Sequence, residues 1–512
     1  MLNTSRRHAT LATLVGSSFT TVIVAIQTVA LIPLYLRAVG AHLYGAWLGS
    51  GDFLVWMQTF DLGLPNVIIQ RIGAAHGKGD AKSVGEYFAT GMLTMAIVAT
   101  LLGLAAFALS FRLPGWMQLA GEEARTLQLC FIIGSGASAL TIFNNSIVGL
   151  ARGIQKTAFM NACTIFASLA SFAVSLIFVL KGWGLWSIAF GLMTRAVVLL
   201  LGSGIFVVAT VRAGLVGFLR IRWTILHEFL LISPATALGG IGYAVMNQSD
   251  TALVAIFLKP ELAAVLNLTR KALEVGRGLV DTIAFATYGG FAHLAASDQR
   301  KRILQVHAEI TTLRLSLAIA MAAAFMAVNS SLVSVWVGSA QYGGALLTIL
   351  IALQFIVVGN SFLMNYLYRA LGPVMKGSLA LAAESVTRVP LMIGLLLWLG
   401  LPGIPIAGVI AGSIYGLLSY RWTIKEVASF AEPRPKPSFS VWATRVTLFG
   451  AGILFCIFFR WNNWAVVLAV GSAIFLSGIA VMTYLDPLLK SLRAPFFSVL
   501  RRLQIAEPMA ES

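Results

Sequence analysis

The sequence predicts an all-α, polytopic membrane protein with about 14 transmembrane helices. Of its 512 residues, 58% are apolar and only 11% are charged, against roughly 25% charged in a soluble globular domain. The apolar residues gather in stretches of about twenty, the length that crosses a hydrocarbon core of about 30 Å as a helix. We therefore expect nearly all of the chain to lie in the membrane, with little mass outside it for a soluble active site.

The apolar stretches define the predicted spans in order along the chain. The first follows Arg6 and Arg7, but it is too long for a signal-peptide core and has no A-x-A-like cleavage site, so we expect it to stay as an anchor. The predicted spans are 11–36, 45–70, 87–111, 126–150, 157–180, 185–211, 229–257, 262–290, 309–336, 345–368, 377–400, 403–420, 441–459 and 463–485.

Lysine and arginine are distributed unevenly over the segments between these spans. With the N-terminus inside, 25 of the 36 fall in cytoplasmic segments, a set that includes Arg314 and Arg445, and six fall in outer loops. Positive residues in short loops stay in the cytoplasm, so this bias predicts that both termini are cytoplasmic. The formal charge of +17 is then a charge on the cytoplasmic rim, facing anionic lipid headgroups, and does not indicate nucleic acid as a partner.

A weak internal repeat divides the first twelve predicted spans into two six-helix lobes. NNSIVGLARGIQK at the end of the fourth span resembles GNSFLMNYLYRALGPVMK at the end of the tenth, as expected of a transporter. We expect an N-terminal lobe at 1–211, a basic linker at 212–228, a C-terminal lobe at 229–421, a Pro-rich linker at 422–440, an appended helix pair at 441–485 and a cytoplasmic tail at 486–512.

Five cations remain inside predicted spans, where an ionisable residue marks a functional site unless it is paired. They are Arg195, Arg270, Lys271, Arg277 and Arg388. Arg195 has no acid within a helical turn on either side, so we expect it to meet either a phosphate or an acid on another helix.

The eighth span carries a charged stripe. Arg270, Glu274, Arg277 and Asp281 lie within about 60° of one another on one helical face, over about 16 Å. Two alternatives remain open at this point. The acids and arginines could be structural pairs within the helix. The segment could also lie on the membrane surface, but the 15 cations that follow it would then move outside, against one inside.

Further intramembrane carboxylates lie in the second, seventh and eleventh spans. Asp52 and Asp61 are nine residues apart, on nearly opposite faces of a regular helix. Pro65 removes the hydrogen bond to the carbonyl of residue 61, and Gly63 lies between, so we predict a hinge here. Asp250 ends a polar run in the seventh span. The eleventh span holds Glu384 and Arg388, at the spacing of a structural i, i+4 pair.

Residues 33–80 resemble the N-terminal signature of the polysaccharide transporter, or O-antigen flippase, family. The family's pattern is a proline, LR-x-x-G, YG-x-W, D-x-G-L and a basic loop ending in GD. The matching residues here are Pro33, Leu36, Arg37, Gly40, Tyr44, Gly45, Trp47, Asp61, Gly63, Leu64, Gly79 and Asp80. The strong match covers about fifty residues, and topology and repeat support the rest.

The resemblance implies a flippase that moves an undecaprenyl-pyrophosphate-linked oligosaccharide across the bacterial cytoplasmic membrane by alternating access. It also implies membership of a larger exporter group, which includes multidrug exporters and peptidoglycan-precursor flippases and in which two six-helix lobes enclose a central cavity. Glycosyltransferases and a polymerase of the same pathway would be its partners, besides membrane lipids. Arginine offers bidentate hydrogen bonds to phosphate, so we expect Arg195, Arg270, Lys271 and Arg277 to bind the pyrophosphate. Asp61 and Asp250 are candidate ion-coupling carboxylates, and Glu274 and Asp281 are further candidate cavity carboxylates.

Two rival functions stay open. A multidrug or small-molecule exporter on the same scaffold would favour a cavity of acids and aromatic residues, but the intramembrane charges are mixed. A membrane-embedded glycan polymerase or ligase would need a substantial outer loop, and the longest, at 112–125, is too short. The sequence has no nucleotide-binding loop, and its three cysteines fit neither a disulfide framework nor a metal site. We therefore expect no enzyme activity, metal or cofactor.

Overall fold

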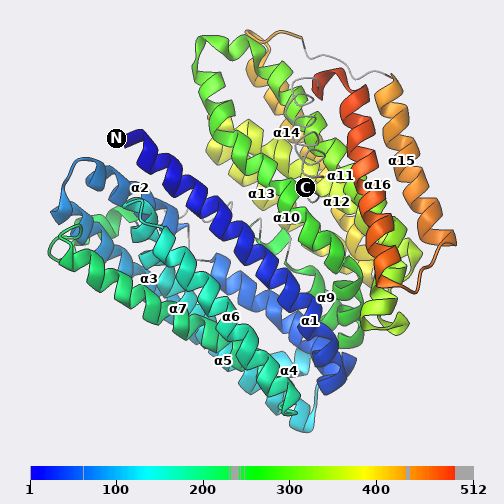
Figure 1. The fold of residues 1–512 in the computed structure, drawn as a ribbon, viewed down its shortest axis with the longest axis horizontal. Helices are drawn as coiled ribbons and strands as arrows, with labels where there is room; N and C mark the ends of the chain where they lie inside the picture. The colour runs from blue at the N-terminus through cyan, green and yellow to red at the C-terminus, as the bar shows by residue number, and fades with distance from the viewer. Residues whose placement is uncertain are drawn as a thin grey trace, which may run out of the picture. The chain divides into compact units, whose positions relative to one another are not determined.

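A computed structural model shows a helical chain, in agreement with the predicted fold class (Figure 1). It describes residues 2–60, 63–229, 231, 242, 244–246, 248–433 and 439–489, and these contain helices and turns but no strand. In this part, 11 helices are long and apolar enough to cross a membrane. Large apolar side chains such as Leu101, Phe166 and Leu201 are exposed on them, which suits a hydrocarbon solvent.

The predicted 14 spans and the 11 apolar helices of the described residues differ at three places. The first predicted span and the first part of the second lie in α1 (Leu2–Thr59), two helical segments joined across a kink at Gly40 (φ 76°, ψ 167°), so that they count as one apolar stretch. Nearly half of the seventh predicted span, 229–257, lies outside the described residues, and the described part ends in the short helix α9 (Asp250–Phe257). The eighth is present as α10 (Pro260–Ala296), in which charged residues are too frequent for a purely apolar span.

The chain divides into two compact units, Met1–Ala264 and Val265–Ser512, which we call the N-terminal and C-terminal units. The division falls inside α10 rather than in the predicted linker at 212–228. That linker is tied to the N-terminal unit, because the N–H of Gly217 donates to the carbonyl of Ala81 (2.7 Å) and Val216 is buried. The predicted limits of the lobes, linkers and tail otherwise stay predictions.

In the N-terminal unit, α5 is the central helix. It packs against α1, α2, α3 and α7, while α6 packs against α1 and α7. Besides α1, the helices of this unit are α2 (Leu64–Gly77), α3 (Ala81–Ser110), α4 (Leu113–Trp116), α5 (Gly121–Gly153), α6 (Ala158–Leu180), α7 (Trp186–Arg212) and α9 (Asp250–Phe257).

The second predicted span is broken where the sequence places Gly63 and Pro65. Helix α1 ends at Thr59 and α2 begins at Leu64, with Gly63 in the left-handed region (φ 67°) and a proline in the first turn of α2. A non-glycine residue would be strained at this φ, and a proline is well tolerated where a helix begins. The break is observed, whereas its action as a hinge stays a prediction.

The GD element of the resembling segment starts α3. The carboxylate of Asp80 accepts hydrogen bonds from the N–H of Ser83 (3.0 Å) and from its hydroxyl (2.5 Å), so Asp80 is the N-cap of the helix. The hydrogen bond from the Ser83 side chain is the main reason that the pKa of Asp80 is lowered. Helix capping is sufficient to explain why an aspartate stands at this position.

In the C-terminal unit, α11 is the central helix, and it is almost wholly buried. It contacts α12, α15 and α16, while α12, α13 and α14 pack on one another. Figure 1 shows α15 and α16, the predicted appended pair, beside α11. The helices are α11 (Ile303–Val337), α12 (Ala345–Ala370), α13 (Val374–Leu399), α14 (Gly403–Val427), α15 (Phe439–Phe458) and α16 (Trp464–Leu485), and three short 3₁₀ turns lie at Asp298–Arg302, Ser339–Gln341 and Pro487–Leu489.

Small residues allow α15 and α16 to approach α11 closely. A Cβ atom added to Gly452 on α15 would lie 2.9 Å from the Cα of Ala323, and one added to Gly478 on α16 would lie 3.3 Å from the Cβ of Ala320. Close backbone approach through small residues is the usual way that helices associate in a membrane.

Candidate functional site

The charged stripe predicted on the eighth span is present on α10, in the C-terminal unit. Glu274 forms ion pairs with two cations: its Oε1 lies 2.6 Å from Nε of Arg270, and its Oε2 lies 3.3 Å from Nζ of Lys271. One turn further along, Arg277 pairs with Asp281 (Nε–Oδ2, 3.0 Å). The stripe therefore contains the intrahelical ion pairs that the sequence left as an alternative. These pairs do not neutralise its positive charge, because three cations share two carboxylates.

Arg314 on α11 adds a fourth cation that the sequence analysis placed on the cytoplasmic rim. Its side chain is fully buried, and its Nη2 lies 3.2 Å from Oδ1 of Asp281. Gly359 on α12 contacts the guanidinium, and a Cβ atom there would overlap Nη2. The sequence already indicated that Arg314 is an intramembrane cation, because it lies inside the predicted span 309–336.

The four cations and two carboxylates leave a surplus of two positive charges. Because Glu274 and Asp281 are each shared between two cations, neither carboxylate neutralises its whole neighbourhood. The side chains of Lys271 and Arg277 are 27% and 32% exposed, against 11% for Arg270 and none for Arg314. Lys271 and Arg277 are therefore the cations that an incoming anion can reach.

Arg195 on α7 lines a pocket of about 320 Å³ in the N-terminal unit. The pocket lies between α1, α5 and α7, and its other polar side chains include Gln58, which donates to the hydroxyl of Ser138 (3.1 Å). Arg195 is the one charged residue in the lining that the structure describes, and no acid there pairs with it. The two partners expected for Arg195, a phosphate and an acid on another helix, both stay predictions.

Two of the other predicted carboxylates, Asp52 and Asp250, lie away from the charged stripe, near the start of α9. Asp52 is buried and accepts a hydrogen bond from the N–H of Ala252 (2.8 Å), at the first turn of α9. Such a contact satisfies an otherwise unpaired N–H of a helix end. Asp250 is the buried first residue of the same helix. Asp61 lies outside the described residues.

Glu384 and Arg388 on α13 are both buried, as expected for a pair inside the membrane. In the part of the chain that the structure describes, Oε1 of Glu384 is buried without a hydrogen-bond partner. The expected i, i+4 pair of Glu384 with Arg388 stays a prediction.

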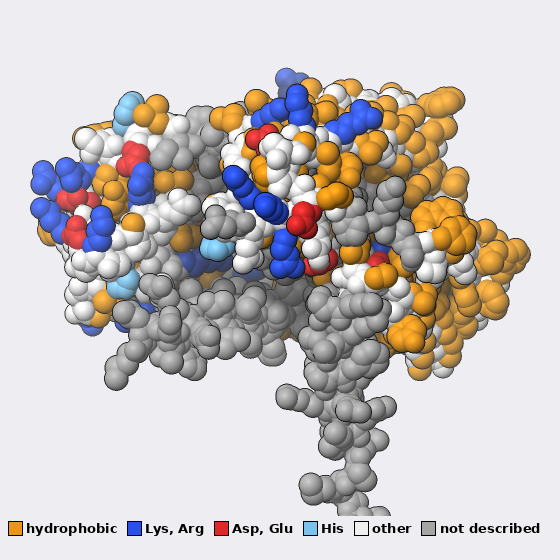
Figure 2. Space-filling model, turned by 90° about the horizontal axis from the view of Figure 1, so that it is seen from above, with side chains coloured by type: hydrophobic (Ala, Val, Ile, Leu, Met, Phe, Trp, Pro, Cys, Tyr) orange, Lys and Arg blue, Asp and Glu red, His pale blue; other side chains and the backbone are white. Residues whose placement is uncertain are grey.

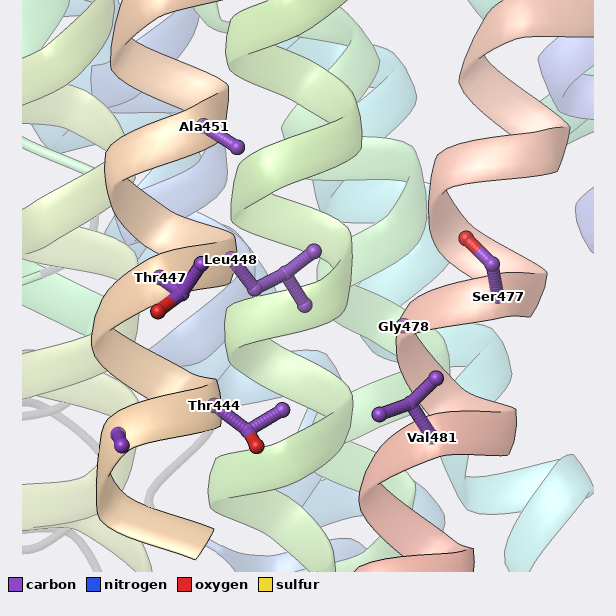
Figure 3. Close-up of a pocket in the computed structure, with 8 residues that line it drawn as sticks. Thr444, Thr447, Leu448, Ala451, Ser477, Gly478 and Val481 are labelled. Carbon is purple, nitrogen blue, oxygen red and sulfur yellow. The ribbon is translucent and has the colours of Figure 1, made fainter. Parts of the chain in front are cut away.

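A second pocket, of about 370 Å³, lies between α15 and α16 (Figure 3). Leu448 and Val481 extend toward each other across it, and Thr444, Thr447 and Ser477 supply hydroxyl groups. Its described lining has no charged residue, so it offers no counter-charge to a phosphate. Figure 2 shows the contrast between hydrophobic surface and the patches where Lys and Arg gather.

A polar contact joins α1 to the start of α10 within the N-terminal unit. Nδ1 of His42 lies 2.7 Å from Oε1 of Glu261. Burial raises the pKa of the Glu261 carboxyl, but hydrogen bonds from its own backbone N–H and from His42 outweigh burial and lower the pKa below its ordinary value of 4.5. This carboxyl lies just before the predicted eighth span.

The lowered pKa predicts a small loss of stability in acid. A carboxyl whose pKa is depressed by folding stabilises the fold above its unfolded pKa of 4.5, and this contribution disappears as the pH falls through the lower, folded value. Glu261→Gln should therefore flatten the decline of the unfolding temperature below pH 4.5, measured by thermal unfolding in detergent. An acid decline as steep as that of the parent protein would contradict the assignment.

Comparison with known proteins gives the fold a context. No family profile and no curated protein matches the sequence. Among solved structures, the lipid II flippase MurJ in an inward closed conformation matches with a TM-score of 0.61 at 12% identity, over 92% of this chain and 98% of that one. An inward-facing multidrug resistance MATE family transporter matches with a TM-score of 0.60 at 13% identity, over 79% of this chain and 95% of that one.

The chain has the fold of the MOP superfamily transporters. A further MOP superfamily transporter, from Pyrococcus furiosus, matches with a TM-score of 0.59 at 14% identity, over 83% of this chain and 95% of that one. This MOP fold agrees with the larger exporter group implied by the resemblance of residues 33–80.

Proposed function

We propose that this MOP-fold protein is a flippase that moves a pyrophosphate-linked lipid oligosaccharide across the bacterial cytoplasmic membrane by alternating access, without covalent chemistry. In this proposal both termini are cytoplasmic, and Arg195, Arg270, Lys271 and Arg277 attract the pyrophosphate. The observation that carries it is a surplus of positive charge at membrane depth, on α10 and in the pocket of Arg195. Such charge is costly in a membrane unless it serves a pathway or a ligand.

Aromatic side chains on α10 support the glycan part of the substrate. Tyr288 is 18 residues after Arg270, which is five helical turns, so it lies on the face of the charged stripe. Its ring is 4.7 Å from that of Tyr366 on α12, and both tyrosines are partly exposed. A tyrosine ring combines an apolar face with a polar hydroxyl, and a sugar ring likewise combines an apolar face with polar hydroxyl groups.

Export of a drug or another small molecule is the second candidate, and MATE transporters share the fold. The observation in its favour is the mainly apolar lining of the Arg195 pocket, which includes Trp47 and Leu54. Its single charged lining residue among those described is a cation, however, so this pocket would repel cationic drugs. We therefore prefer the anionic, lipid-linked substrate.

Transport by the purified full-length protein in liposomes separates the two functions. The probe is the fluorescently labelled lipid-linked oligosaccharide pool of the source cells, and its flipping is followed by a membrane-impermeant quencher. We expect quenching of the inner-leaflet fraction to need the native protein, with heat-inactivated protein as the control. A cationic dye loaded in parallel should not move. Dye transport without lipid flipping would instead establish the exporter.

A further inference from the structure

The geometry around Asp281 assigns a distinct task to each of its two arginines. Oδ2 of Asp281 faces Arg277 on the same helix, and Oδ1 faces Arg314 on α11, at 3.0 and 3.2 Å. Arg277 is 32% exposed, whereas Arg314 is fully buried and Asp281 is 9% exposed. One carboxylate thus links a reachable cation to an unreachable one.

Arg314 is held in place by its surroundings. Gly359 leaves room for the guanidinium, and a Cβ atom at that position would overlap it. The Nε and Nη1 groups of Arg314 are buried without hydrogen-bond partners among the described residues, so Asp281 is the anion there that compensates its charge. Leaving Asp281 would strand a buried cation, a cost of several kcal/mol. Arg314 therefore stays with Asp281.

The same cost controls whether Arg277 can move. If Arg277 turned from Asp281 to a ligand and no other cation were present, a buried carboxylate would be left unpaired. With Arg314 at Oδ1, the carboxylate keeps a partner while Oδ2 is vacated. The second carboxylate of the stripe has a similar arrangement, since Glu274 is shared between Arg270, which is 11% exposed, and Lys271, which is 27% exposed.

We propose that Arg314 is a positioning residue for phosphate binding: it is the permanent counter-ion of Asp281 and so releases Arg277 to an incoming phosphate group. This inference rests on the proposed function, because it takes a pyrophosphate as the ligand. Arg314 does not touch the phosphate. It lowers the cost of exchanging the Arg277–Asp281 pair for an Arg277–phosphate pair, in which arginine donates two parallel hydrogen bonds.

Binding of inorganic pyrophosphate to the full-length protein in detergent, measured by isothermal titration calorimetry, tests this assignment. Arg277→Ala should raise the Kd about 10- to 100-fold. Arg314→Gln should raise the Kd about tenfold or more, because Arg277 is then needed by Asp281. Adding Asp281→Asn to Arg314→Gln should restore the Kd to within about threefold of the parent protein, since a neutral side chain no longer retains Arg277.

A merely structural Arg314 would give a different pattern, because the second substitution could not restore an anion affinity lost through misfolding. If Arg277→Ala weakens binding as expected but Arg314→Gln leaves it unchanged, or if the double variant stays as weak as the single one, the role of Arg314 is wrong and the anion site stands. If the parent protein does not bind pyrophosphate, the proposed anion site fails, and this role with it.

A single variant keeps the proposal testable if Arg314→Gln does not fold. Asp281→Asn alone removes the carboxylate that competes with phosphate for Arg277, so the Kd for pyrophosphate should fall, by about threefold or more. Arg212→Ala is the matched control, because Arg212 is an exposed cation at the end of α7. An unchanged or weaker affinity in Asp281→Asn would overturn the exchange.

Discussion

Replacing Arg195 or Arg277 with alanine is expected to slow flipping of the lipid-linked substrate about 10- to 100-fold in reconstituted liposomes. A hydrogen bond between a charged donor and its ligand contributes about 1.5–3 kcal/mol, which corresponds to that range. Arg195 is the charged residue in the described lining of its pocket, and Arg277 is the most exposed arginine of the α10 stripe. Neither variant should reduce the amount of folded protein severely, since both side chains are partly accessible.

Arg212→Ala is the control for a general loss of positive charge, because it lies on the same helix as Arg195 but at its exposed end. It should flip the substrate at the parent rate. Full activity in both Arg195→Ala and Arg277→Ala, at normal expression, would remove the pyrophosphate site from the proposed mechanism. Loss in one variant alone would assign the phosphate contact to that unit of the chain.

The largest expected effect on stability belongs to Asp486, just after α16. Its Oδ2 accepts from Nη2 of Arg445 on α15 (3.2 Å), and the same Nη2 donates to the hydroxyl of Ser316 on α11 (3.2 Å). The side chain of Asp486 is fully buried and that of Arg445 is 10% exposed. Asp486→Ala leaves a buried cation without its counter-ion, so we expect a loss of about 3–5 kcal/mol in the free energy of unfolding.

Removing both charges is the matched control for that prediction. In the double variant Arg445→Met and Asp486→Ala no charge is stranded, so it should regain most of the stability that the single variant loses. Reversible denaturant unfolding in detergent measures both. A double variant less stable than Asp486→Ala would show that the pair contributes net attraction rather than mutual compensation.

Hydropathy and charge bias were sufficient for the helical fold, because spans of this length have few alternatives in a bilayer. They were insufficient for Arg314 and Arg445. Counting basic residues by loop assigns every cation near a span end to the rim, whereas α11 begins at Ile303, well before Arg314. The local sequence does not show that each of these cations pairs with a buried acid far away in the chain, Arg314 with Asp281 and Arg445 with Asp486.

The candidate site shows the same limit. Helical periodicity placed Arg270, Glu274, Arg277 and Asp281 on one face, and their pairing follows from spacing alone. The contact of Asp52 with Ala252 joins residues 200 positions apart, so only the folded chain reveals that this carboxylate caps a helix. Likewise, Arg195 is a lone cation in the sequence, and the pocket around it exists only once α1, α5 and α7 have packed.

The alanines of α11 change what counts as a conservative substitution in this protein. On α3, Leu101 and Leu104 are exposed, so we expect apolar side chains of other sizes to be tolerated there. On α11, Ala320 and Ala323 lie against glycines of α16 and α15, where a larger apolar residue would push the helices apart. Exchanging alanine and leucine keeps the side chain apolar at both kinds of position. Size, rather than polarity, is therefore the constraint under which the buried helix can evolve.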